Sequence, residues 1–233
     1  MRIRIPLALG AFAILAAGAW RLMPDPAPMA PLSALFPPGV QYQFDPPEAG
    51  SYRLNRIKPA PDGAVLDIHG APQTLTALTA GKITLVSFVY LTCGDVNGCP
   101  LAMSVLFDIH DKSLHLPGLR EDVQLMTVSF DPARDTVEAI DAFAYPVTSD
   151  PARAEKFDWH VLTTQGMEQL QPILDGYGQV VDRGGEEDQI SHLLRMYLVD
   201  RDGMIRNVYG LGVMDPRLLM TDVQTLLLEE QGA

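Results

Sequence analysis

The run at residues 83–90 constrains the fold of this chain more than any other segment. Its sequence, ITLVSFVY, is almost continuously apolar and rich in β-branched and aromatic residues. Such a run is typical of a central strand that is covered on both faces, as in sheets whose parallel strands are linked by helices. The segment therefore predicts a buried strand in the middle of an α/β sheet.

The segments around this strand alternate between strand and helix patterns. Further strands are predicted at residues 64–68, 123–130, 193–199 and 204–209, the last two as a hairpin around the turn at 200–203. Helices are predicted at residues 101–114, 135–144, 166–177 and 218–229, with Asp135 and Glu138 as a capping pair and a kink or a break at Pro172. This order predicts an α/β fold of the thioredoxin-like kind, with a central mixed sheet flanked by helices.

Two cysteines follow the central strand, and the chain contains no others. Cys93 and Cys99 lie between this strand and the helix pattern that follows Pro100, so they occupy a strand-to-helix junction. Thiols near the N-terminal end of a helix favour the thiolate form, which binds soft metals and exchanges disulfides. The pair can therefore hold a metal, carry electrons, or form a structural disulfide.

The first 22 residues have the pattern of an export signal. Arg2 and Arg4 precede an uncharged run at 5–20, and the small residues at 17–19 have the form of a cleavage site. The run is shorter than the roughly 20 residues that span a bilayer comfortably, so a cleaved signal peptide and an uncleaved membrane anchor both stay open. Either interpretation places the rest of the chain outside the cytoplasm, on the periplasmic side of the membrane, where disulfides persist.

A proline-rich stretch at 23–47 separates this signal from the predicted domain at 48–233, and it predicts an extended linker. The chain has 17 basic and 29 acidic residues, which gives a formal net charge of −12. Such a surface repels the phosphates of nucleic acid, so we expect no nucleic-acid partner. An acidic balance also serves ordinary solubility and does not by itself identify a protein partner.

Three segments resemble the Sco/SenC family of copper-binding proteins, which act in cytochrome oxidase maturation. These segments are SFVYLTC at 87–93 with Cys99-Pro100, VSFDPARDT at 128–136, and ISH at 190–192 followed by the hairpin. The resemblance covers about residues 48–230. It implies a copper site formed by Cys93, Cys99 and His192, and two thiolates with an imidazole suit both Cu(I) and Cu(II).

The resemblance also implies a function. The protein would be a copper-binding chaperone, or a thiol reductant, in the assembly of a copper site in a respiratory oxidase or another exported cuproenzyme. Its partner would be the copper-receiving subunit of that enzyme, and its N-terminal segment would hold it to the membrane.

The spacing of the cysteines departs from the family pattern. The family usually has three residues between its cysteines, whereas five separate Cys93 from Cys99 here. Asn97-Gly98 looks like the insertion and favours a local turn, and Asp95 matches the family's loop aspartate but also fits ordinary turn chemistry. The longer loop changes the strain of a disulfide, so the family's copper affinity and redox potential do not carry over.

Other functions of the same residues stay open. A thiol–disulfide oxidoreductase acting without metal would use Cys93 and Cys99 as its redox pair. Thioredoxin-type reductases place a cis-proline opposite their thiols, however, and no proline occurs between Pro172 and Pro216. A peroxiredoxin-type peroxidase is a weaker alternative, because no proline and threonine stand at the required distance before Cys93. The last alternative is a non-catalytic binding module in which the cysteines form a structural disulfide.

The remaining candidate residues have plainer interpretations. Isolated methionines such as Met103 and Met196 are more often core fillers than metal ligands. Asp131, Arg134 and Asp135 are expected to fix a strand-to-helix turn rather than to act on a substrate. Surface or locally bonded roles are expected for the histidines without a motif, which are His69, His110, His115 and His160.

Overall fold

The computed structural model describes residues 29–39, 42, 44–94, 98–184 and 190–232. The predicted signal or anchor at 1–22 lies outside the described residues, as do the start of the predicted linker, Asp95 and Asn97. Within the part of the chain that the structure describes, no helix is both long and apolar enough to span a membrane.

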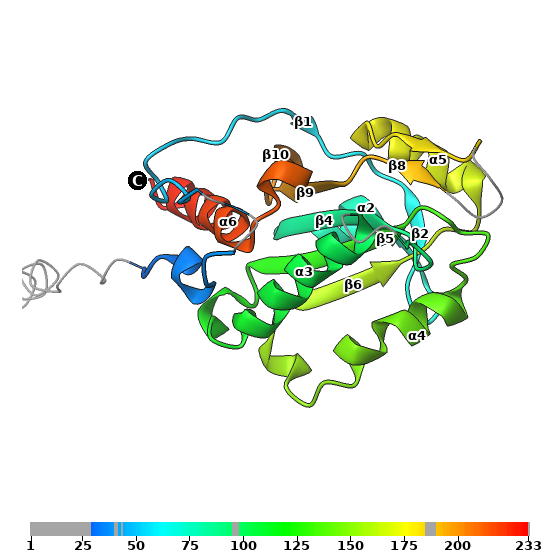
Figure 1. Ribbon diagram of the computed structural model, residues 1–233, viewed down its shortest axis with the longest axis horizontal. Helices are drawn as coiled ribbons and strands as arrows, with labels where there is room; N and C mark the ends of the chain where they lie inside the picture. Colours follow the sequence, from blue (N-terminus) through cyan, green and yellow to red (C-terminus); the bar gives the residue numbers. More distant parts are fainter. Residues whose placement is uncertain (1–28, 40–41, 43, 95–97, 185–189, 233) are drawn as a thin grey trace, which may run out of the picture. The chain divides into compact units, whose positions relative to one another are not determined.

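A six-stranded sheet forms the centre of the described part of the chain (Figure 1). Its strands are β1 (Lys58–Pro59), β4 (Ile83–Val89), β5 (Val123–Ser129), β6 (Asp158–Leu162), β9 (Arg195–Val199) and β10 (Met204–Gly210). The order across the sheet is β1-β10-β9-β4-β5-β6. β4, β5 and β6 are parallel, whereas β9 is antiparallel to β4, β10 to β9, and β1 to β10. The sheet is therefore mixed, as predicted.

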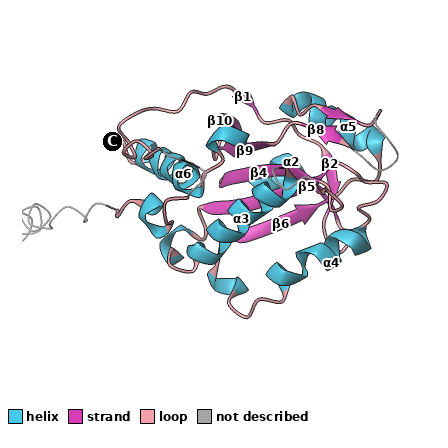
Figure 2. Ribbon diagram, in the orientation of Figure 1, coloured by secondary structure: helices cyan, strands magenta, loops and turns pink. Residues whose placement is uncertain are grey.

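Helices and short strands surround this sheet (Figure 2). The helices are α2 (Leu75–Thr79), α3 (Cys99–Ser113), α4 (Val137–Thr148), α5 (Met167–Tyr177) and α6 (Pro216–Glu230). The short strands pair as β2 (Ala64–Leu66) with β3 (Pro72–Thr74), and β7 (Val181–Asp182) with β8 (Ser191–His192). Single 3-10 turns occur at η2 (Leu32–Leu35), η3 (Pro117–Leu119), η4 (Arg153–Glu155) and η5 (Leu211–Val213).

The helices cover both faces of the sheet, which explains why every residue of β4 and β5 is buried. Trp159 of β6 shares a face with Leu85 through the register of the parallel strands, and its ring contacts α3 at Phe107, with ring centroids 4.9 Å apart. Phe88 points to the opposite face, where Tyr177 of α5 lies with its ring centroid 5.0 Å away. The buried central strand predicted from the apolar run is thus confirmed, together with the α/β fold class.

The helix after β5 begins at Val137, two residues after the predicted start at residue 135. Thr136, rather than Asp135, is the N-cap of α4, and its hydroxyl accepts a hydrogen bond from the backbone N–H of Ala139. Asp135 cannot cap this helix because its carboxylate accepts hydrogen bonds from Leu91 and Ser129 inside the protein. Pro172 lies inside α5, which continues through it as one helix.

The N-terminal segment from residue 31 onward runs along α6, whose residues 219–227 are all buried. The backbone N–H groups of Leu32, Gly50 and Leu54 donate to side chains of this helix at 2.9 to 3.2 Å. Leu32 and Phe36 belong to the core. The described part of the predicted linker therefore contacts the domain, while its role as a membrane spacer stays a prediction.

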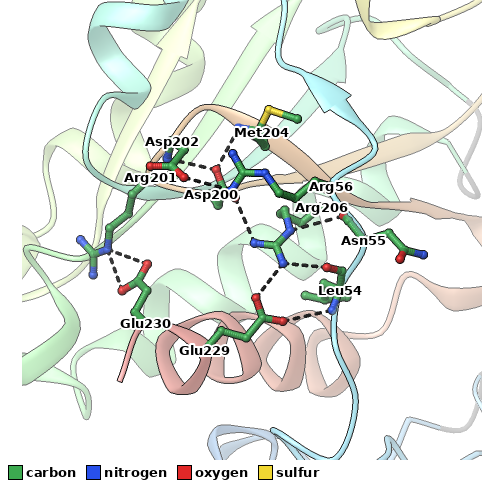
Figure 3. A network of polar contacts seen from close by, with 10 residues as sticks. All are labelled: Leu54, Asn55, Arg56, Asp200, Arg201, Asp202, Met204, Arg206, Glu229 and Glu230. Atoms are coloured by element: carbon green, nitrogen blue, oxygen red, sulfur yellow. Dashed lines mark hydrogen bonds and ion pairs between the residues drawn. The ribbon is translucent and has the colours of Figure 1, made fainter. Parts of the chain in front are cut away.

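An ion-pair network holds the β9–β10 turn against α6 (Figure 3). The Arg206 guanidinium donates to Asp200 at 3.0 Å, to Glu229 at 2.7 Å and to the carbonyl oxygen of Leu54 at 2.6 Å. Because β9 is antiparallel to β4, this turn lies at the end of the sheet opposite the loop that carries the cysteines. The network therefore belongs to the scaffold and lies away from the candidate site.

Candidate metal centre

Cys93, Cys99 and His192 come together at the edge of the sheet where the parallel strands end. Cys99 Sγ lies 3.6 Å from His192 Nε2, and one ligand atom from each of the three residues lies within 4.8 Å of the others. Both cysteines are free thiols. The residues that the sequence singled out are therefore neighbours in space, and their role as metal ligands stays a prediction.

The two cysteines take their positions from the strand-to-helix junction. The backbone N–H of Cys93 donates to the carbonyl oxygen of Tyr90 at 3.3 Å, which turns the chain directly after β4. Cys99 is the first residue of α3, with Gly98 as its N-cap and Pro100 in the first turn. Proline suits this place because the first helical N–H groups have no partner within the helix. The junction predicted for the thiols is thus observed.

His192 comes from the short β7–β8 pair, in which it lies opposite Val181. Its Nδ1 is 3.3 Å from the carbonyl oxygen of Ile190. The tautomer that donates from Nδ1 to this carbonyl leaves a lone pair on Nε2, the atom that faces Cys99. The Ile190 carbonyl therefore helps to orient the imidazole so that Nε2 faces Cys99.

Aromatic rings form a wall beside these ligands. The ring centroid of His192 is 5.7 Å from that of Tyr90 and 4.9 Å from that of Phe130. The Tyr90 and Phe130 centroids are 5.1 Å apart, and both side chains are buried. The wall limits the movement of the imidazole and covers part of its surface.

Burial controls the protonation of the site. Cys99 is only 3 % exposed, and burial, followed by the nearby Cys93, raises the pKa of its thiol. This result differs from the expectation of a thiolate at the helix N-terminus, because for Cys99 desolvation outweighs the helix. Burial and then a hydrogen bond with Cys93 raise the pKa of Tyr90 to about 12. The metal-free site thus holds a protonated Cys99, and binding of a soft metal there must release that proton.

A pocket of about 750 Å³ opens beside the ligands. Its lining includes Gly98 and His192 from the site, and Leu193 and Leu211, which are exposed on its rim. Cys99 itself is nearly covered. The side of the site that borders this pocket is therefore a natural approach for another molecule.

The other residues considered as ligands do not join the cluster. Met103 and Met196 are buried in the hydrophobic core, as expected for core fillers. His110 lies near the carboxylates of Asp111 and Asp150. Lys156 already lies between those two carboxylates, with its Nζ 2.6 Å from each. That second group is therefore an ion pair rather than a metal site.

Sequence reasoning missed the roles of Tyr90 and Phe130 as the aromatic wall. Both follow directly after neighbouring parallel strands, β4 and β5, whose register places their ends side by side. Two aromatic residues at equivalent strand ends are the signal that could have revealed this contact.

Comparison with known proteins places these features in a family. The family model described as SCO1/SenC matches residues 65–228. The SCO1 protein homolog of Bacillus subtilis (strain 168) is 26% identical over 133 residues, which cover 56% of this chain and 63% of the relative. The chain thus spans less than two thirds of the length of this curated relative.

Solved structures show the same fold. The copper-bound ScoI of Arabidopsis thaliana has a TM-score of 0.57 at 22% identity, covering 72% of this chain and 99% of that one. BsSco, a member of the Sco family of cytochrome c oxidase assembly proteins in which a disulfide switch was identified, has a TM-score of 0.57 at 22% identity, covering 77% and 98%. These likenesses confirm the predicted thioredoxin-like arrangement.

Proposed function

Because this chain belongs to the SCO1/SenC family, we propose that it binds copper through Cys93, Cys99 and His192. The observation that carries the proposal is the 3.6 Å approach of Cys99 Sγ to His192 Nε2, with Cys93 in the same cluster. Two sulfur ligands suit Cu(I), and the imidazole extends the donor set to Cu(II). ScoI, a protein of the same fold, is known with copper bound.

The protein acts as a copper-binding chaperone in the assembly of a copper site, in a respiratory oxidase or in another exported cuproenzyme. BsSco, a relative in fold, belongs to a family of cytochrome c oxidase assembly proteins. A second role, reduction of the client's thiols, is favoured by the two free cysteines that lie next to each other. In this role Cys93 attacks the client disulfide and Cys99 resolves the mixed disulfide, which leaves two client thiols and one disulfide here.

Copper titration tests the binding proposal. The reduced protein should bind one copper ion, and Cys93→Ser or Cys99→Ser should abolish tight binding because a hydroxyl is a poor ligand for a soft metal. His192→Ala should weaken Cu(II) more than Cu(I). His115→Ala is the matched control, because His115 is exposed and outside the cluster. Parent-like binding by all three site variants would show that copper binds elsewhere.

The two roles differ in what the protein gives to its client, which is copper in the first role and electrons in the second. We expect copper-loaded protein to lose its metal to a reduced copper-site domain of an oxidase, with its own cysteines still reduced. If the protein is instead a thiol reductant, metal-free protein should reduce the oxidised form of that domain and gain a disulfide between Cys93 and Cys99. Mass spectrometry of trapped thiols reads out both results.

The protein is exported. Residues 1–22 either anchor it to the cytoplasmic membrane or are cleaved as a signal peptide, which releases the protein. The support is the order of Arg2 and Arg4 before the uncharged run. A reporter fused after Ala233 should be active only outside the cytoplasm. Reporter activity in the cytoplasm would refute export, whatever the outcome of the copper titration.

A further inference from the structure

The site has two halves, which come from separate parts of the chain. Cys93 and Cys99 belong to the β4–α3 junction, and His192 belongs to the β7–β8 pair. One segment, residues 129–135 at the end of β5, contacts both halves. This segment, SFDPARD, is not part of the ligand set.

Asp135 connects the segment to the cysteine half. Its Oδ2 accepts a hydrogen bond from the backbone N–H of Leu91 at 3.2 Å and another from Ser129 Oγ at 2.5 Å. Leu91 is two residues before Cys93, at the point where the loop leaves β4. The carboxylate therefore fixes the start of the loop that carries the cysteines.

The Asp135 side chain contributes to its own turn through Ser129, whose hydroxyl also accepts a hydrogen bond from the backbone N–H of Asp131. Thr136 caps α4 in its place, and Asp131 forms its own ion pair with Arg134. Asp135 is only 1 % exposed, and a buried carboxyl group is costly unless hydrogen bonds satisfy it. Its described side-chain partners are Ser129, inside the turn, and Leu91, so the bond from Leu91 is what it contributes to the cysteine loop.

Phe130 connects the same segment to the histidine half. Its ring lies 4.9 Å from the imidazole of His192, between centroids, and its side chain is fully buried. Its backbone carbonyl accepts a hydrogen bond from the guanidinium of Arg183, which follows β7. Because β7 pairs with β8, this bond ties the strand pair that carries His192 to the end of β5.

We propose that residues 129–135 are the positioning element of the metal centre, with Asp135 placing the cysteine loop and Phe130 placing His192. The inference rests on the proposed copper function. Its physical basis is that the cysteine half and the histidine half both contact the same segment at the end of β5. The ligand atoms therefore stay close before any metal binds. Removal of the Asp135 acceptor leaves the Leu91 N–H unpaired and frees the loop.

Three variants test the cysteine half. Asp135→Ala removes both acceptor contacts, whereas Asp135→Asn keeps an oxygen that can accept from Leu91. Ser129→Ala removes one partner of the carboxylate and is the milder change. Asp131→Ala is the matched control, because it removes the ion pair with Arg134 in the same segment and keeps the bond between Asp135 and Leu91.

Three measurements separate positioning from general stability. They are the Cu(I) affinity, the thiolate-to-Cu(II) absorption band, and the dithiol–disulfide potential of the metal-free protein. We expect Asp135→Ala to lower Cu(I) affinity by about ten- to a hundredfold, as for other residues that orient metal ligands, and to shift the band and the potential. Asp135→Asn should restore all three, Ser129→Ala should give a smaller change in the same direction, and Asp131→Ala should leave them as in the parent.

Phe130→Leu tests the histidine half, and it should weaken Cu(II) more than Cu(I), as His192→Ala does. The inference is overturned if Asp135→Ala keeps the affinity, absorption band and potential of the parent, or if Asp135→Asn loses as much as Asp135→Ala. Neither result contradicts the proposed copper site. If Asp135→Ala does not fold, an unchanged potential in Ser129→Ala overturns it. If the parent binds no copper, the proposed function fails, and the potentials of the metal-free variants still decide whether Asp135 positions the cysteines.

Discussion

Cys99 Sγ and His192 Nε2 lie 3.6 Å apart although the two residues are 93 positions apart in the sequence. Strand pairing produces this approach. β4 ends just before the cysteine loop, β9 begins just after His192, and the two strands pair antiparallel with Ser87 opposite Met196. The ligands therefore meet because the sheet aligns the end of one strand with the start of the other, without any covalent link between the two segments.

The longer cysteine loop leads to a redox prediction. We expect Cys93 and Cys99 to interconvert between dithiol and disulfide, and the oxidised form to bind no copper, because metal and disulfide compete for the same sulfur atoms. Deletion of Asn97 and Gly98 should restore family-like spacing and shift the potential. Alkylation of the reduced protein should modify Cys93 before the buried Cys99.

Equilibration with glutathione buffers measures this potential, and mass spectrometry follows the alkylation. A potential below about −300 mV, which is the range of structural disulfides, would contradict the prediction. It would favour a structural disulfide if the thiols also resist alkylation after mild reduction.

The ion-pair network in Figure 3 gives a prediction for stability. Arg206 and Asp200 are both largely buried, with side chains 9% and 7% exposed. Arg206→Ala removes the buried guanidinium from the Asp200 carboxylate, which keeps the exposed Arg56 at 3.8 Å, and should reduce the free energy of unfolding by about 3–5 kcal/mol. Urea denaturation measures this loss. Copper affinity should not change, because the network lies at the other end of the sheet.

Arg56 provides the matched control in the same network. Its side chain is 53% exposed, and its guanidinium lies 3.0 Å from Asp202 and 3.8 Å from Asp200. Exposed ion pairs contribute roughly 0–1 kcal/mol, so Arg56→Ala should be almost neutral. Equal losses for the two variants would show that burial does not determine the strength of this network.

Much of the architecture could be predicted from the sequence because it follows from local patterns. The apolar run at 83–90 indicated the central strand. The hairpin turn lies at 200–203, as the turn-favouring residues Asp200, Asp202 and Gly203 predicted. The strand-to-helix junction correctly located the cysteines. His192 was found through the resemblance, since a lone histidine near a short strand has no local signal of its own.

The contacts between distant segments could not be predicted. The Asp135 carboxylate reaches Leu91, 44 residues away in the sequence, and this long-range bond displaced it from the helix cap that its local pattern suggested. The pKa of Cys99 likewise depends on burial by the folded core, which the sequence around it does not reveal. Local chemistry predicted the elements, whereas tertiary contacts decided what individual polar groups do.

The N-terminal contacts predict that residues before 48 stabilise the domain. Removal of residues 1–47 uncovers part of α6 and loses the buried side chains of Leu32 and Phe36. At about 1.5–3 kcal/mol for each buried side chain, the free energy of unfolding should fall by roughly 3–6 kcal/mol. A protein that starts at Met29 keeps both side chains and serves as the control. Equal stability of the two shortened proteins would show that the domain begins after this segment.

His110 gives a prediction for the pH dependence of stability. It is a buried residue of α3 that packs against Trp159, and burial lowers its pKa below the ordinary value of 6.5. The charge of Lys156 adds to this effect, while Asp111 and Asp150 oppose it. Below about pH 6.5 His110 binds a proton in the unfolded chain but stays neutral in the folded protein. Its contribution to the free energy of unfolding is therefore present above about pH 6.5 and is lost as the pH falls through the pKa of the folded protein.

His110→Leu removes this proton linkage and should make the loss of stability between about pH 7 and pH 5 shallower than in the parent. Part of the loss should remain, because burial also lowers the pKa of His160. Urea denaturation at several pH values measures the slope, and His115→Leu is the control because His115 is exposed. If His110→Leu and His115→Leu both keep the parent slope, His110 does not contribute to the acid sensitivity of the fold.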